Sequence, residues 1–217
     1  MLESWTLIAI CLPFATAVGI LATHRWPNLR EAVSVASGVI LFGIIWLLLY
    51  QPILDGQRIE IHLFSVVSGI DLAFRAEPMG LLFALIASFL WFVTIIYAIG
   101  YMRGHGEQNQ TRFYCLFAVA IGAVMGISFA ENLFTLFIFY EVLTLCTYPL
   151  VTHAGTDKAR HGGRVYLGIL LSTSIGFFLL GLVATWSVAG SLSFTPGGLL
   201  SEQASPLVLS AILVLFV

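Results

Sequence analysis

The chain has 217 residues, of which 59% are hydrophobic and only 9% are charged, and its formal net charge is −2. Soluble globular domains carry about 25% charged residues, so this composition indicates an all-α polytopic membrane protein. No basic cluster is present, which argues against nucleic-acid binding. The three cysteines and five histidines lack the spacings of zinc, iron–sulfur or haem sites, so we expect no metal, no cofactor and no redox centre.

Charge-free apolar runs that are long enough to cross a bilayer recur along the chain. A transmembrane helix needs about 20 apolar residues, within a range of roughly 17–25. We interpret the first run as a retained span, because Glu3 stands where a signal peptide carries positive charge. The six predicted transmembrane helices cover residues 4–23, 32–51, 78–100, 113–130, 132–151 and 165–189.

Residues 55–77, between the second and third spans, are unusually polar for this chain. Polar and apolar side chains alternate over residues 58–64 and again over residues 71–74, with Ser68 and Gly69 between the two runs. Two short alternating runs around a turn predict a small β-hairpin outside the membrane.

Residues 206–217 begin a seventh apolar helix. The eleven residues from Leu207 to Val217 reach only about 16 Å, whereas the hydrocarbon core is about 30 Å thick. We therefore expect one transmembrane domain over residues 1–217, with a truncated seventh helix, that is the N-terminal part of a larger subunit. Either a fragment or a split gene would produce such a chain.

Lysine and arginine are distributed unevenly between the two sets of connections. Because cytoplasmic loops are enriched in these residues, we expect the N-terminus and the hairpin to lie in the periplasm of a bacterium, and the chain in its inner (plasma) membrane. The connections after the first, third and fifth spans hold Arg25, Arg30, Arg103, Arg112, Lys158, Arg160 and Arg164, and the others hold Arg58 and Arg75.

Glu141 lies deeper inside an apolar run than any other acid or base of the chain. Ten residues, or about 15 Å of helix, separate it from Glu131 at the interface, which places it near the bilayer midplane. A charge there costs about 2.5–3.5 kcal/mol on insertion scales, so such residues are mostly functional. Burial favours the neutral acid and a nearby cation favours the carboxylate, and a balance of the two lets the group load and release a proton. We predict that Glu141 is a proton or ion relay; the alternative is a carboxylate bonded to a neighbouring helix for packing.

Thr144 and Tyr148 follow Glu141 by three and seven residues, which places all three on one face of a helix. They are candidate members of the same relay, together with ordered water. An alternative stays open for both, because threonine often bonds its own helix backbone and tyrosine gathers at membrane interfaces.

The stretch AENLFTLFIFYEVLTLCTYPLV, followed by a polar loop and GGRVYLGILLSTSIGFFLLG, resembles a family of antiporter-like membrane subunits. These are the large subunits of respiratory complex I and of Mrp-type cation/proton antiporters, and the resemblance is greatest to the D-type subunits of the Mrp antiporters. In this family an Asp/Glu-Asn hairpin precedes a span with an aromatic-Glu pair. Glu131-Asn132 and Tyr140-Glu141 occupy those places.

The resemblance implies that Glu141 is the essential fifth-span glutamate, which in the family pairs with a lysine of a broken seventh helix. It implies translocation of protons, or exchange of sodium for protons, by a multisubunit antiporter whose other membrane subunits are the partners. One alternative is a proton-pumping subunit of a complex I-type NADH-quinone oxidoreductase or related hydrogenase, a translocase only as part of that complex. A second alternative is a non-conducting structural fragment.

Overall fold

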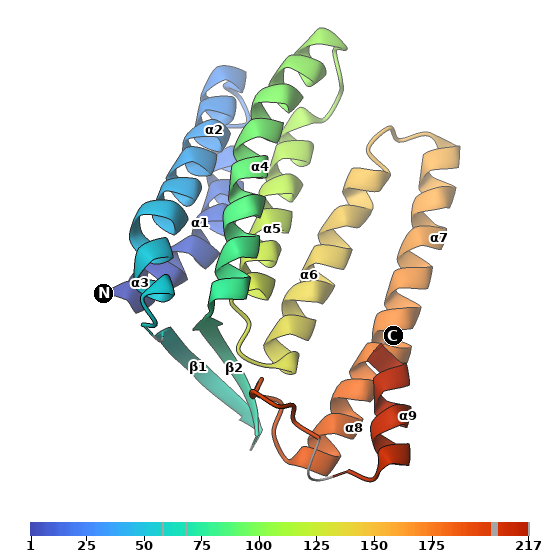
Figure 1. The fold of residues 1–217 in the computed structure, drawn as a ribbon. Coiled ribbons are helices and arrows are strands. Elements are labelled where there is room, and N and C mark those ends of the chain that lie inside the picture. The colour runs from blue at the N-terminus through green and yellow to red at the C-terminus, as the bar shows by residue number, and fades with distance from the viewer. Residues whose placement is uncertain (58, 68, 201–203, 217) are drawn as a thin grey trace.

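The computed structural model describes residues 1–57, 59–67, 69–200 and 204–216, and these residues are mostly helical (Figure 1). The helices are α1 (Leu2–Ala22), α2 (Pro27–Gly43), the π-helical η1 (Ile44–Leu49), α3 (Tyr50–Leu54), α4 (Pro78–Gly104), α5 (Gln110–Ser128), α6 (Leu133–Val151), α7 (Asp157–Thr173), the π-helical η2 (Ser174–Phe178), α8 (Leu179–Ala189) and α9 (Pro206–Phe216). The strands are β1 (Ile59–Val67) and β2 (Ile70–Ala76).

Within these residues, six helical segments are long and apolar enough to cross a membrane, and α9 is a shorter apolar helix after them. The strands β1 and β2 pair antiparallel between the second and third spans. The predicted fold class, six spans with a small hairpin, is therefore confirmed. The predictions for Arg58 and Ser68 in the hairpin and for Val217 in the last helix lie outside the described residues.

Two spans are composite and begin earlier than the charge-free runs. The second runs through α2, η1 and α3 as Pro27–Leu54, and the sixth runs through α7, η2 and α8 as Asp157–Ala189. Caps, rather than the limits of the apolar run, set where these helices begin. Pro27 occupies the first turn of α2, and the Thr156 hydroxyl accepts a hydrogen bond from the Ala159 amide at 3.1 Å.

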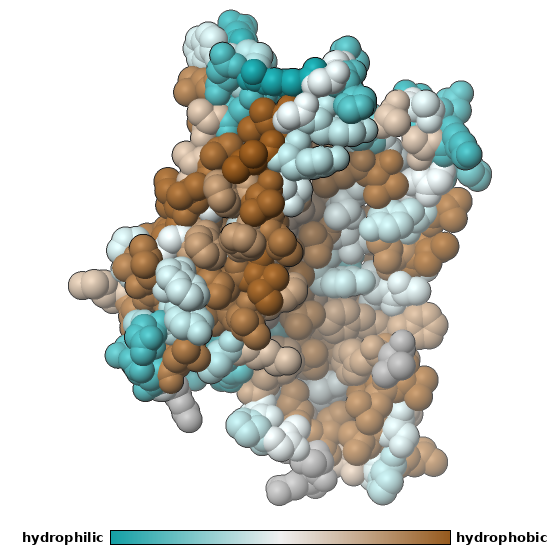
Figure 2. All heavy atoms as spheres, turned by 45° about the horizontal axis from the view of Figure 1, so that its top comes forward, coloured by the Kyte–Doolittle hydropathy of each residue, from teal (hydrophilic) through white to brown (hydrophobic). Residues whose placement is uncertain are grey.

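The up-and-down path of the chain gives the molecule two polar ends. The hairpin end carries the β-hairpin, the α5–α6 turn and the α8–α9 connection, and the loop end carries the connections that follow α1, α4 and α6 (Figure 1). Figure 2 shows a broad apolar surface between hydrophilic residues at these ends. This band is the surface that a bilayer would cover, and the periplasmic placement of the hairpin end stays a prediction.

Glycines let the helices around α5 approach closely. The main core joins α1, α2, α4 and α5 through buried side chains such as Ile20, Leu41 and Trp91. On α5, Gly122 lies against the Phe14 ring of α1 and Gly126 against the Phe139 ring of α6. Their spacing of four residues thus serves packing, which is the usual use of this pattern.

We expect Gly126→Ala to destabilise the protein by about 1–3 kcal/mol, because a Cβ atom there would overlap the Phe139 ring and force it away. Thermal unfolding in detergent measures the effect. Gly100→Ala is the matched control, since Gly100 is also helical and its Cβ would meet nothing within 4 Å. Equal melting temperatures for the two variants would contradict this packing.

Candidate functional site

Glu141 lies midway along α6 with its side chain partly buried. Its Oε1 atom is buried and has no hydrogen-bond partner among the described residues. A buried carboxyl oxygen without a partner costs free energy, and the cost is largest for the charged form. The interhelical hydrogen bond that the packing alternative requires of this atom is therefore not present in the described part of the chain.

Thr144 and Tyr148 share α6 with Glu141, and the described residues contain no hydrogen bond that joins either side chain to it. Thr144 is 5% exposed. Tyr148 packs at the contact between α6 and α7, where a Cβ atom added at Gly163 would lie 3.2 Å from Tyr148 Cε2. The structure thus brings Tyr148 between two helices, and both residues remain candidates for the relay.

A hydroxyl pair between α6 and α7 was not predicted. The Thr147 hydroxyl donates to the Thr144 carbonyl oxygen at 2.9 Å and lies 3.4 Å from the Tyr166 hydroxyl oxygen. Helical spacing places Thr147 partly off the helix face that Glu141, Thr144 and Tyr148 share. The sequence gives no indication of Tyr166, because that contact depends on how α7 packs on α6.

A cavity of about 620 Å³ lies beside the middle of α6. Tyr140, Thr173 and Ser174 are among the residues that line it, and residues of α9 lie along one side. Phe178 of η2 lies between these helices, with ring centroids 5.9 Å from Tyr140 and 5.6 Å from Phe216. Tyr140, the residue next to Glu141, thus borders both the π-helical η2 and the cavity. Single π-helical turns within α-helices are frequent at functional sites.

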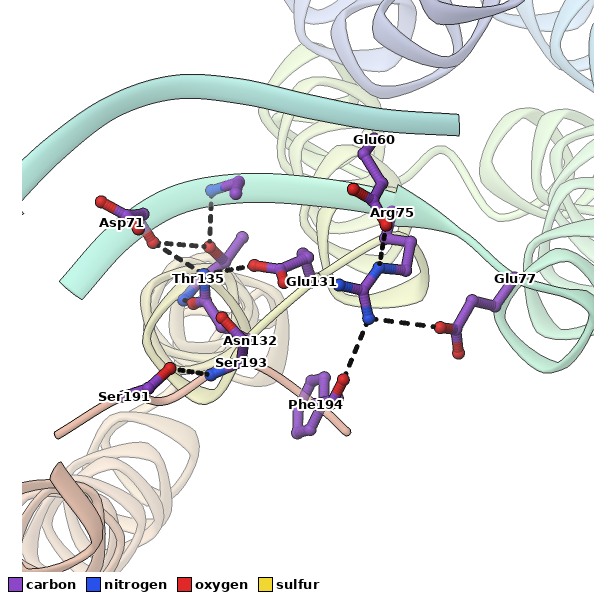
Figure 3. Close-up of polar contacts among 11 residues, drawn as sticks. Glu60, Asp71, Arg75, Glu77, Glu131, Asn132, Thr135, Ser191, Ser193 and Phe194 are labelled. Carbon is purple, nitrogen blue, oxygen red and sulfur yellow. Dashed lines mark hydrogen bonds and ion pairs between the residues drawn. The ribbon is translucent and has the colours of Figure 1, made fainter. Parts of the chain in front are cut away.

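Glu131 and Asn132 directly precede α6 at the hairpin end (Figure 3). The Asn132 Oδ1 atom accepts from the Thr135 amide at 2.8 Å and caps the helix. Its Nδ2 atom donates to the Asp71 carbonyl oxygen at 2.9 Å and to Glu131 Oε2 at 3.1 Å. Glu131 Oε1 forms an ion pair with Arg75 Nη2 at 2.7 Å. The Glu-Asn pair of the sequence is thus a buried anchor for the helix that carries Glu141.

A second buried ion network lies at the loop end and corrects the sequence-based interpretation. The charge pattern places Arg30 and Glu31 in a polar loop, whereas both lie in α2 and are only 4% and 5% exposed. Glu31 Oε2 lies 2.6 Å from Arg103 Nη2, and Glu31 Oε1 lies 3.4 Å from Arg30 Nη2. The Arg30 guanidinium also donates to Thr111 and Gln110, each at 2.9 Å. Three helix ends converge here and bury charges that the local pattern assigns to solvent.

Two family models match consecutive parts of the chain. Residues 64–114 match the N-terminus of chain 5 of NADH-ubiquinone oxidoreductase (complex I), and residues 130–217 match the transmembrane region of NADH:quinone oxidoreductase and Mrp antiporters.

Curated relatives carry the names of both kinds of complex. Over 125 residues, or 58% of its length, the chain is 30% identical to NADH-quinone oxidoreductase subunit N of Desulforudis audaxviator. Over 196 residues, or 90% of its length, it is 24% identical to the putative antiporter subunit mnhD2 of Staphylococcus epidermidis. The matches cover only 24% and 38% of the lengths of those relatives.

Solved structures share the fold. The Mrp complex from Dietzia sp. matches 97% of this chain with a TM-score of 0.79 at 16% identity, and the match covers 22% of the solved chain. The membrane-bound sulfane sulfur reductase, an archaeal respiratory membrane complex, matches 86% of this chain with a TM-score of 0.71 at 20% identity, and the match covers 28% of the solved chain.

Proposed function

Because the chain belongs to the family of antiporter-like membrane subunits that complex I and the Mrp antiporters share, we propose that it forms part of an ion-translocating subunit of a multisubunit cation/proton antiporter. The observation that carries the proposal is the partly buried Glu141, whose Oε1 atom is unpartnered among the described residues halfway along a transmembrane helix. A carboxyl group in such a place can accept and release a proton or a small cation.

In this proposal Glu141 relays the ion, and Thr144 and Tyr148 extend the path along α6 toward the loop end. The partners are other membrane subunits, as the names of the relatives indicate for those proteins. The loop end, which holds most of the lysines and arginines, faces the cytoplasm of a bacterium, and the N-terminus lies outside. The transported ions are protons, with sodium as the counter-transported cation.

Redox-driven proton pumping is the second candidate. The observation that favours it is the 30% identity to subunit N of NADH-quinone oxidoreductase over 125 residues. The identity to the antiporter subunit is lower, 24%, although that alignment is longer, 196 residues. In this case the chain would translocate protons within a complex I-type assembly or a related hydrogenase, without itself holding a redox centre.

Reconstitution of the complex that contains this chain into proteoliposomes with a trapped pH indicator separates the two. The antiporter proposal predicts that an imposed sodium gradient drives proton movement without any electron donor. Proton movement that requires NADH and a quinone, and that ignores sodium, would establish the second candidate instead. Ion movement under neither condition would contradict both.

A further inference from the structure

The α5–α6 turn and the segment that follows α8 extend the hairpin into a larger hydrogen-bonded layer. We call this layer the end plate: β1, β2, residues 129–133 and residues 192–194. Two backbone hydrogen bonds add the turn to the free edge of β2, and two more add the segment that follows α8 to the turn. The four bonds run from Arg75 N to Phe129 O (2.7 Å), Glu131 N to Ala73 O (3.1 Å), Phe194 N to Glu131 O (3.1 Å) and Leu133 N to Leu192 O (3.1 Å).

The Arg75 side chain crosses the end plate and uses all three guanidinium nitrogens (Figure 3). Its Nε atom contacts Glu60 of β1 at 3.1 Å, and its Nη2 atom contacts Glu131 at 2.7 Å. Its Nη1 atom donates to the Phe194 carbonyl oxygen at 3.0 Å and lies 3.5 Å from Glu77. One side chain thus ties the hairpin, the residue before α4, the α5–α6 turn and the segment that follows α8.

The contacts of Arg75 differ in how well they are shielded from water. The Glu131 side chain is 8% exposed, whereas those of Glu60 and Glu77 are 54% and 57% exposed. Exposed ion pairs contribute little, while a buried charge that loses its partner is strongly destabilised. Among the ion pairs of Arg75, the one with Glu131 is therefore expected to contribute most to the position of the turn.

From Glu131 the connection reaches α6 directly. Glu131 Oε2 accepts from Asn132, and Asn132 caps the first turn of α6. Glu141 lies in the same helix as this capped turn, about 12 Å along the helix axis from Leu133, the first residue of α6. Because one continuous helix joins the capped turn to Glu141, a shift or rotation of that end would also move Glu141.

We propose that Arg75 is a positioning residue for Glu141. By fixing the hairpin end of α6 against the end plate, it sets the depth of the Glu141 carboxyl group in the membrane and its orientation. The consequence for transport rests on the function proposed above, but the effect on the placement of Glu141 does not. A displacement of about 1 Å at a reacting group can cost on the order of 100-fold in rate.

The test replaces Arg75 by Gln in the complex that contains this chain. The probe is a hydrophobic carbodiimide, which modifies carboxyl groups in apolar surroundings. Mass spectrometry of the peptide that contains Glu141 measures the rate at which the carbodiimide modifies this residue. We expect Arg75→Gln to change that rate by about threefold or more and to lower ion transport per assembled complex by about tenfold or more. Arg75→Lys keeps a positive charge facing the buried Glu131 carboxylate and should keep both rates within about twofold of the wild type. Glu60→Gln is the matched control, because it removes an exposed partner of the same guanidinium and should change neither rate by more than about twofold.

Arg75→Gln is expected to fold, since the Thr135 hydroxyl still accepts from the Ala73 amide at 3.0 Å and holds α6 to β2. If it does not assemble, Arg75→Gln/Glu131→Gln removes the unpaired buried carboxylate as well, and the same readouts apply. An unchanged Glu141 modification rate in an assembled variant, or failure of both variants to assemble, would overturn the proposal. A changed modification rate with unchanged transport would overturn its link to transport. If the wild-type complex moves no ion, the proposed function fails while the modification rate still tests the positioning role.

Discussion

Glu141→Gln is expected to reduce ion translocation by the reconstituted complex about 100-fold or more, while the chain still assembles. Glutamine keeps the volume of the side chain but can neither accept nor release a proton. Assembly should survive because, in the described part of the chain, the Glu141 Oε1 atom makes no hydrogen bond that the substitution could break. The measurement is the initial rate of proton movement in proteoliposomes, normalised to the assembled complex.

Three further variants test whether the loss of transport is specific to Glu141 and whether the neighbouring hydroxyl groups take part. Glu3→Gln neutralises an exposed acid of α1 and should leave the rate within about twofold of the wild type. Thr144→Val and Tyr148→Phe should lower it by about two- to tenfold if these hydroxyls extend the relay. Full transport by Glu141→Gln would contradict the relay, and unchanged rates for both hydroxyl variants would confine the relay to Glu141.

Glu31→Ala is expected to lower the free energy of unfolding by about 3–5 kcal/mol. The substitution removes the carboxylate that pairs with Arg30 and Arg103, and Arg30 is only 4% exposed, so its charge would stay buried without a counter-ion. The neutral oxygens of Thr111 and Gln110 accept its hydrogen bonds but do not balance the charge. Thermal unfolding in detergent micelles measures the loss.

Glu3→Ala serves as the control for this stability effect, because Glu3 is exposed in the first turn of α1. Its removal should cost under about 1 kcal/mol, which is the usual contribution of an exposed acid near a helix N-terminus. Similar losses for Glu31→Ala and Glu3→Ala would mean that the Glu31 network does not hold the three helix ends together.

The spans and the hairpin could be predicted, and Glu141 could be singled out as a candidate, because each has a local signature. Uninterrupted apolar runs predict six crossings, and alternation on either side of Gly69 predicts two strands, and the structure contains both. Glu141 is recognisable as a single charge inside an apolar run, which needs no knowledge of its neighbours.

The contacts of Arg75 at the hairpin end and the ion network around Glu31 at the loop end could not be predicted in this way. Arg75 meets Glu131 across 56 positions of the sequence, and Arg103 meets Glu31 across 72. Such pairs form only because helix ends and the hairpin converge in space, and no periodicity records that convergence. The pattern assigns Arg30 and Glu31 to solvent for the same reason, since charges beside an apolar run indicate a loop unless neighbouring helices cover them.

The most direct measurement of the central claim is the protonation of Glu141 itself during changes of pH. Infrared difference spectra of the complex, recorded across the range in which it transports ions, should contain a band from a carboxylic acid C=O group that gains or loses its proton. We predict that this band is present in the wild type and absent from Glu141→Gln. Identical spectra for the two proteins would contradict the assignment of Glu141 as the group that carries the proton.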